Sequence, residues 1–189
     1  MSDTVQGILD SAERFMRRGG YHAFSFRQIA EEIGIKSASV HYHFPTKEAL
    51  GVAATKRYED RFMAFLGDPV AAGRSPQKQL EHFQLGFLGA FEKDGAICLC
   101  GMLLSEAAEL PATVREAVRH FVDAQLEWLA AVVAGAQPRS RAVTRKAIAR
   151  TLFGAMQGAL AQSILEQDSA AIAEVGAQMK KILAGPKAS

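Results

Sequence analysis

The stretch SFRQIAEEIGIKSASVHYHF, residues 25–44, has the pattern of two short helices joined at a glycine. Ser25 and Gln28 have the spacing of a capping box, in which the serine oxygen accepts a backbone N–H and the glutamine reaches back to the serine amide. Gly34 then ends the first helix. The second begins near Ser37 and ends at Phe44, because the following proline disfavours the helical conformation for the residue before it.

The second of these helices is short and unusually polar. Its obvious core residues are few, chiefly Ile35, Val40 and Phe44. A helix that served only for packing would not need so polar a surface. Two helices joined by a tight glycine turn and stabilised by a preceding helix form the helix-turn-helix, which places its second helix in the major groove of DNA.

His41 and His43 lie two residues apart in this polar helix. At 3.6 residues per turn their side chains point about 200° apart, so they cannot hold one metal ion together without breaking the helix. We therefore predict no metal site. Each ring either meets DNA or packs beneath the following helix.

The remainder of the chain also has helical spacing of its apolar residues, without the alternation typical of strands. A first helix ends at Gly19, and a fourth is capped by Thr46. A loop rich in glycine and proline covers residues 67–76. Five more helices are predicted at 76–92, 98–109, 112–135, 139–166 and 170–183. The fold class is therefore all-α, with about nine helices.

Composition is that of an ordinary globular protein, with 189 residues, 49% hydrophobic, 22% charged and a formal net charge of +2. The amino terminus lacks the pattern of a secretory signal, and the apolar run 96–104 is too short to span a membrane. We expect a cytoplasmic protein without a membrane partner. Cys98 and Cys100 are too few and too close for a disulfide framework.

The stretch GIKSASVHYHFPTKEAL, residues 34–50, resembles the signature of TetR-family transcriptional regulators. The resemblance implies an N-terminal three-helix DNA-binding domain at 1–47. It also implies a larger helical domain at 48–189 for dimerisation and ligand binding, and it implies neither catalytic residues nor a cofactor.

By this resemblance, a set of residues in the second, third and fourth helices matches positions that contact DNA in the family. Lys47 matches a phosphate-binding lysine, and small side chains on the third helix allow close approach to base edges. His41 stands where the family more often has tyrosine. The complete predicted set is Arg27, Ser37, Ala38, Ser39, His41, Tyr42, His43 and Lys47.

Aromatic and polar residues in the larger domain are first of all candidates for the core, and the resemblance places an effector cavity among the helices that carry them. Either cysteine could pack as a small apolar residue or sense oxidants and electrophiles from a helix start. The predicted pocket set is Phe83, Phe87, Cys98, Cys100, Met102, Phe121, Gln125, Trp128, Phe153 and Gln157.

Small residues follow one face of the helix at 139–166, where two glycines lie one turn apart. Glycine inside a helix costs about 0.5–1 kcal/mol relative to alanine, so a compensating close approach of another helix is expected. The resemblance places a homodimer interface here, together with the final helix. The predicted set is Thr151, Gly154, Ala155, Gly158, Ala161, Ile172, Val175 and Met179.

These expectations describe a homodimeric repressor that binds a pseudo-palindromic operator in double-stranded DNA and is released by a small-molecule or electrophile effector. Two alternatives belong to other classes. One is an enzyme with Cys98 or Cys100 as nucleophile and His82 or His120 as base, although no oxyanion-hole or cofactor motif supports it. The other is a helical interaction module without DNA-binding activity.

Overall fold

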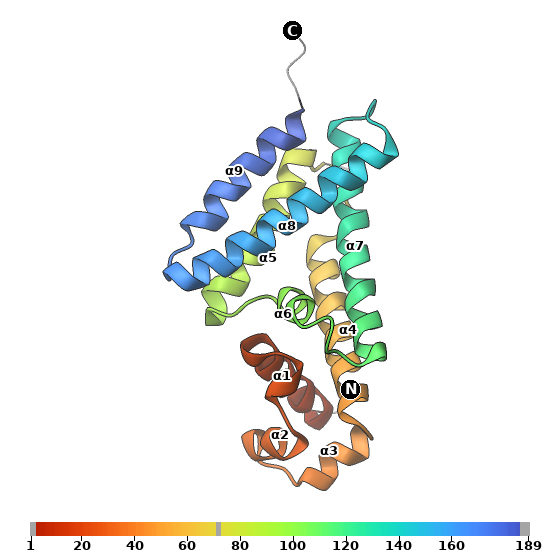
Figure 1. Ribbon diagram of the computed structural model, residues 1–189, viewed down its shortest axis with the longest axis vertical. Coiled ribbons are helices and arrows are strands. Elements are labelled where there is room, and N and C mark those ends of the chain that lie inside the picture. The colour runs from red at the N-terminus through yellow and green to blue at the C-terminus, as the bar shows by residue number, and fades with distance from the viewer. Residues whose placement is uncertain (1–2, 71–72, 186–189) are drawn as a thin grey trace. The chain divides into compact units, whose positions relative to one another are not determined.

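The computed structural model describes residues 3–70 and 73–185 (Figure 1). Within these residues the chain forms nine α-helices and one 3-10 helix and no strand, so the all-α prediction is confirmed. Residues 71–72 of the predicted loop lie outside the described part. The elements are α1 (Asp3–Gly19), η1 (Tyr21–Ala23), α2 (Phe26–Ile33), α3 (Ser37–His43), α4 (Lys47–Leu66), α5 (Pro76–Asp94), α6 (Leu99–Ser105), α7 (Ala112–Ala136), α8 (Ala142–Glu166) and α9 (Ala170–Ala184).

The chain divides into two compact units. The first unit consists of residues up to 61 together with 98–121, and the second consists of 62–97 together with 122 onward. Helices α4 and α7 each contribute residues to both units. The predicted division of the chain between residues 47 and 48 remains a prediction.

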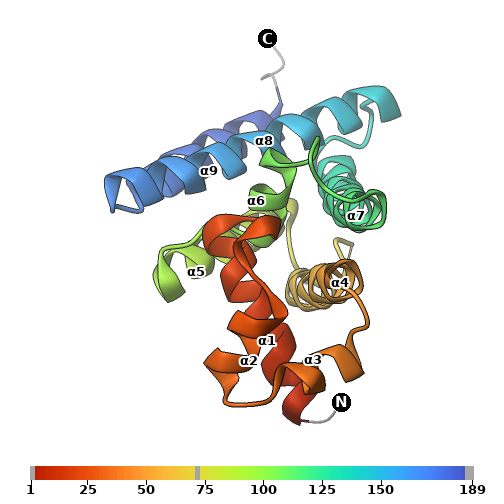
Figure 2. The ribbon, with the colours of Figure 1, turned by 60° about the horizontal axis from the view of Figure 1, so that its bottom comes forward.

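The first unit is built around α1, which packs against α2, η1 and α6. Figure 2 shows α1, α2 and α3 gathered together. Ile8, Ala12 and Met16 from α1 and Ile29 from α2 have no exposed surface. Those of α1 recur every four residues, which is why the predicted apolar face becomes the core.

An ionic cluster in the first unit joins α1 to α4. The Glu13 carboxylate, whose side chain is 10% exposed, accepts hydrogen bonds from Arg61 Nη2 at 2.6 and 2.8 Å. Arg57 Nη2 lies 3.4 Å from the same carboxylate, and Arg57 also bonds Asp10 and Gln6 of α1. Sequence periodicity did not predict these contacts, because charges on an otherwise apolar helix face have partners far away in the chain.

The second unit contains α8 and α9 side by side, with α5 packed against both (Figures 1 and 2). The α9 helix is fixed on α5 by several polar contacts. Gln84 Nε2 donates to the Ile172 carbonyl at 3.2 Å, and Lys180 Nζ lies 2.7 Å from Glu81 Oε1. Gly176 leaves room for the end of the Gln84 side chain, because a Cβ there would lie 2.2 Å from Gln84 Oε1.

The α6 helix is shorter than predicted, ending at Ser105 rather than near residue 109. The chain then makes turns in which Glu109 N donates to the Glu106 carbonyl at 2.9 Å. The Glu106 carboxylate accepts a hydrogen bond from the Tyr21 amide at 2.8 Å, which draws this residue toward η1. Gly20 fits beside it with φ +82°, and a Cβ there would lie 1.6 Å from Glu106 Oε1. The residue that follows the last turn of α6 is therefore bound to a distant backbone donor.

We expect Glu13→Gln to lower the free energy of unfolding by about 1–3 kcal/mol, because it removes a nearly buried charge partner from two arginines. Urea denaturation followed by circular dichroism measures this change. Glu116→Gln is the matched control, since the Arg119–Glu116 pair leaves both side chains at least 60% exposed. The control should cost less than about 1 kcal/mol. Equal losses in the two variants would show that the Glu13 cluster adds nothing beyond a surface ion pair.

Candidate nucleic-acid interface

The two ends of α2 are fixed by local hydrogen bonds and by one glycine. Ser25 Oγ accepts from Gln28 N at 3.3 Å, as the capping-box spacing predicts. The reciprocal contact differs from the prediction, because the Ser25 hydroxyl donates to Gln28 Oε1 at 2.9 Å and the glutamine does not reach the serine amide. At the other end Gly34 takes φ 71° and ψ 32°, a left-handed conformation that favours glycine.

The third helix, α3, is seven residues long and buries a single side chain, Val40. The Phe26 ring of α2 packs edge to face on the His41 ring, with centroids 4.6 Å apart. His41 is nevertheless exposed, and Tyr42 beside it is 85% exposed. His41 therefore has a packing contact and an open surface at once, whereas the Tyr42 ring extends away from the core.

Most of the predicted DNA-contacting set lies on accessible surface. Arg27, Ala38, His41 and Tyr42 are exposed, while Ser37, Ser39, His43 and Lys47 are half-buried. Arg27 forms an ion pair with Glu31 at 2.8 Å, in which the two side chains are 84% and 62% exposed. An ion pair so exposed contributes little, so Arg27 can exchange Glu31 for a phosphate at small cost.

Lys47 has a structural contact that the sequence did not predict. Its Nζ donates to the Phe24 carbonyl at 2.7 Å and lies 4.5 Å from the centre of the Phe24 ring and 5.1 Å from that of Tyr21. Burial lowers the pKa of this ammonium group. Because an ammonium group has three N–H donors, the bond to Phe24 leaves donors for a phosphate. Lys47 thus ties the start of α4 to the segment before α2.

Most of the predicted pocket residues are buried, but they are divided between the two units. Phe83, Phe87 and Trp128 form one aromatic cluster in the second unit, with ring centroids 5.0 Å apart for Phe83–Phe87 and 6.0 Å for Phe83–Trp128. Gln125 and Phe153 are buried in the same unit, where Gln157 is half-buried. The first unit holds the remaining members, Cys98, Cys100, Met102 and Phe121.

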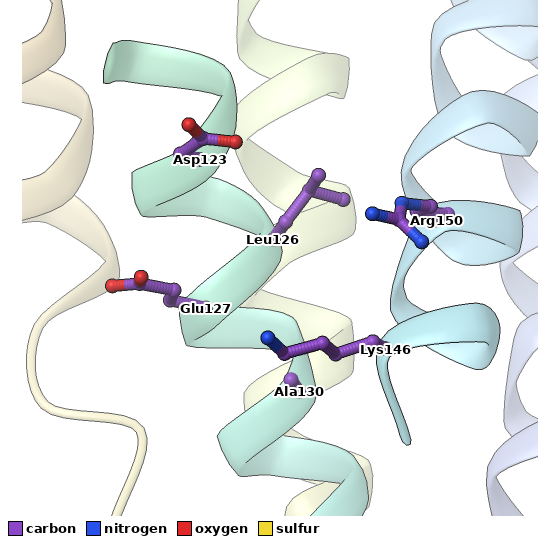
Figure 3. Close-up of a pocket in the computed structure, with 6 residues that line it drawn as sticks. All are labelled: Asp123, Leu126, Glu127, Ala130, Lys146 and Arg150. Atoms are coloured by element: carbon purple, nitrogen blue, oxygen red, sulfur yellow. The ribbon is translucent and has the colours of Figure 1, made fainter. Parts of the chain in front are cut away.

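Two hollows in the structure are lined by other residues. One, of about 220 Å³, belongs to the first unit and is lined by Val52, Lys56, Glu59, Asp60, Ala117 and His120. The other, of about 120 Å³, lies between α7 and α8 in the second unit (Figure 3). Neither includes a residue of the predicted pocket, which remains a prediction.

The predicted dimer residues differ in their accessibility. Thr151, Gly154, Gly158 and Ala161 of α8 are exposed, and Ala155 and Val175 are half-buried. Ile172 and Met179 are each only 1% exposed, because their side chains pack inside the same chain. These two residues therefore hold α9 against the rest of its own chain.

Among the residues that the structure describes, no group of three or more histidine, cysteine, aspartate or glutamate side chains is gathered so that it could hold a metal ion. No helix of this part has the length and apolar character needed to cross a membrane.

An exposed polar α3, joined to α2 through the Gly34 turn and supported by α1, defines a helix-turn-helix DNA-binding protein. Residues 8–54 match the sequence model described as bacterial regulatory proteins, tetR family. The crystal structure of a TetR transcriptional regulator from Legionella pneumophila shares 30% sequence identity, with a TM-score of 0.90 over 96% of this chain and 98% of that one. The chain belongs to the TetR family of transcriptional regulators.

Other relatives agree over nearly the full length. The HTH-type transcriptional regulator LmrA of Bacillus subtilis is 24% identical over 96% of this chain and 97% of its own length. A TetR-family regulator from Agrobacterium tumefaciens has 29% identity and a TM-score of 0.85, covering 94% of this chain and 96% of that chain. The protein is therefore a DNA-binding transcriptional regulator and not an enzyme.

We expect Lys47→Ala to weaken binding to all DNA sequences alike and to lower the salt dependence of binding by about one phosphate contact. Ser39→Ala should instead change sequence preference, because the family resemblance predicts that this side chain approaches base edges. Fluorescence anisotropy with operator and unrelated duplexes at several salt concentrations measures both effects. Lys56→Ala, an exposed lysine on the same helix, is the control. If Lys47→Ala left the salt dependence of binding unchanged, this lysine would contact the Phe24 carbonyl but no phosphate.

Proposed function

We propose that the protein acts as a homodimeric repressor whose two α3 helices enter successive major grooves on one face of a pseudo-palindromic operator. In such a complex the reading helices are spaced by one turn of DNA, about 34 Å. A small-molecule effector bound to the larger domain would change the separation of these helices and release the operator. The family membership supports DNA binding itself, and the surface of α8 supports the dimer.

The observation that carries the dimer proposal is an uncovered face of α8. Gly154 and Gly158 are exposed in the middle of a 25-residue helix, and a Cβ added to either would meet nothing within 4 Å. Packing inside the chain therefore does not require these glycines. Their cost in a helix, about 0.5–1 kcal/mol each, has no compensation within one protomer. A second helix approaching this face closely would supply it.

Apolar side chains extend the same face toward both ends of α8. Val143 is 64% exposed and Leu165 is 84% exposed, and both share the side of the helix that carries the two glycines. The α9 helix adds the half-buried Val175 and the 38% exposed Ile182. A two-fold axis through this surface would bring identical faces together and form a four-helix bundle.

We expect Gly158→Leu to convert the dimer to a monomer, because the new side chain fills the space that the partner helix needs. Sedimentation-equilibrium measurements report the mass, and operator binding should weaken at least about tenfold, because the linked second reading head is lost. Gly89→Leu is the control. Gly89 is also an exposed helical glycine with open space around a new Cβ, on α5. A dimer that survives Gly158→Leu, or a wild-type monomer, contradicts the proposal.

The effector proposed for this domain is a reversibly bound small molecule. The alternative, an electrophile that modifies a cysteine, needs an accessible thiol, whereas Cys98 and Cys100 are 5% and 1% exposed. Cys98 also caps α6, because its Sγ accepts a hydrogen bond from the Gly101 amide at 3.3 Å. Coupling between effector and operator of about 1–3 kcal/mol is typical for such a response.

Iodoacetamide should therefore label neither cysteine in the native protein and both cysteines after unfolding in urea. Mass spectrometry of the intact chain counts the added groups. Burial excludes the reagent from the thiols, and unfolding removes that protection. Rapid labelling of the native protein at Cys98 would instead favour the electrophile effector.

A further inference from the structure

The segment between α1 and α2 is bound by a side chain that comes from a distant part of the first unit. Glu106, the first residue after α6, accepts a hydrogen bond from the Tyr21 amide at 2.8 Å. Gly20 leaves the space for this carboxylate, because a Cβ there would overlap it. Glu106 therefore joins the end of α6 to the segment that leads into the helix-turn-helix.

The same segment lies against the start of α4. Tyr21 and Phe24 are 4% and 2% exposed, and Lys47 Nζ lies 5.1 and 4.5 Å from the centres of their rings. The Lys47 ammonium group also donates to the Phe24 carbonyl at 2.7 Å. Gly51, one turn after Lys47, brings the α4 backbone close, because a Cβ there would lie 2.8 Å from Tyr21 Cε2. The position of the Lys47 ammonium group thus depends on the position of residues 21–24.

A lysine that is already held in place binds a phosphate more favourably than a freely moving one. The lysine side chain is flexible, and the loss of its freedom on binding opposes association. In this structure two rings and one carbonyl already restrict Lys47, and the single hydrogen bond leaves N–H donors for a phosphate. A shift of residues 21–24 would remove this restriction.

We propose that Glu106 is a positioning residue for the contact of Lys47 with a DNA phosphate. The Glu106 carboxylate holds the Tyr21 amide, and residues 21–24 in turn hold the Lys47 ammonium group, which presents its remaining N–H donors to the phosphate. Glu106 acts without touching the DNA. The proposal rests on the predicted phosphate contact of Lys47, and it requires neither the dimer nor the effector of the proposed function.

Electrostatics alone predicts the opposite effect of removing Glu106. A carboxylate in the unit that carries the reading helices repels phosphates, so loss of its charge should leave DNA binding unchanged or strengthen it. Loss of the hydrogen bond to Tyr21 should weaken DNA binding instead. The sign of the change therefore separates a positioning role from a general effect of charge. Glu109, an exposed acid three residues later, provides the reference for charge.

Three variants separate the hydrogen bond from the charge. Glu106→Ala removes both, whereas Glu106→Gln removes the charge but keeps an oxygen that can accept from the Tyr21 amide. Glu109→Ala removes a nearby charge only. If Glu106→Ala does not fold, as judged by circular dichroism, Glu106→Asp takes its place, because it withdraws the carboxylate by one methylene group and keeps the charge.

Fluorescence anisotropy with a mixed-sequence duplex at several salt concentrations measures the affinity and its salt dependence. Glu106→Ala should weaken binding at least about threefold and lower the salt dependence by about one phosphate contact, as is predicted for Lys47→Ala. Glu106→Gln should bind within about twofold of the wild type, and Glu109→Ala should bind at least as tightly as the wild type. Tighter binding by Glu106→Ala, or equal losses in Glu106→Ala and Glu106→Gln, would overturn the proposal.

A double variant tests whether Glu106 acts through Lys47. In the Lys47→Ala background, Glu106→Ala should weaken binding by less than about twofold, because the contact that it positions is already absent. An equal loss in both backgrounds would show that Glu106 supports the reading helices as a whole, and it would contradict the positioning role. If Lys47→Ala alone changes neither affinity nor salt dependence, the phosphate contact and the proposal both fail. If Lys47→Ala weakens binding and Glu106→Ala does not, only the proposal fails.

Discussion

Burial of Val40 is the contact on which the DNA-reading surface depends. A helix of seven residues is too short to be stable alone, so α3 persists only through its attachment to the rest of the first unit. Val40 is its single buried side chain, and burying a valine contributes about 1.5–3 kcal/mol. Because one buried apolar residue attaches α3, its remaining positions do not have to be apolar. This is the physical reason why the helix can be so polar.

A small contact of this kind can position α3 only if its surroundings are rigid. Three polar ties in the first unit serve that purpose: Lys47 to the Phe24 carbonyl, Glu106 to the Tyr21 amide, and Glu13 to Arg57 and Arg61. Two of them use a charged side chain on a backbone group of the segment between α1 and α2. Charge-assisted hydrogen bonds are stronger than neutral ones, so they add to the burial of Tyr21 and Phe24 in holding this segment. Lys47 therefore supports the same surface that it is predicted to help dock on a phosphate.

The sequence predicted the structural features that depend on residues close together in the chain. The Thr46 cap on Ala49, the left-handed Gly34 and the end of α3 at Phe44 all follow from local signals, and each is present in the structure. Long-range partners could not be predicted in this way. The contact of Glu106 with the Tyr21 amide joins residues 85 positions apart, and the burial of Met179 depends on how α9 packs within its own chain. Periodicity indicates that a helix face is apolar, but it does not indicate which surface covers that face.

The α8 helix shows this limit most clearly, because it has apolar residues on two faces. One face, with Leu152, Met156 and Leu160, is completely buried in the second unit. The other carries Val143, Leu165 and the two glycines and is open in a single chain. Burying the two exposed side chains would contribute about 1.5–3 kcal/mol each, which exceeds the cost of about 0.5–1 kcal/mol for each helical glycine. Exposure of this second face to water is thus unfavourable for a single chain, and its burial between two chains would be favourable. Association through this face would need the small residues, because they let the two helix backbones approach each other. Lys146 and Arg150 mark the edge where this face gives way to the hollow shared with α7.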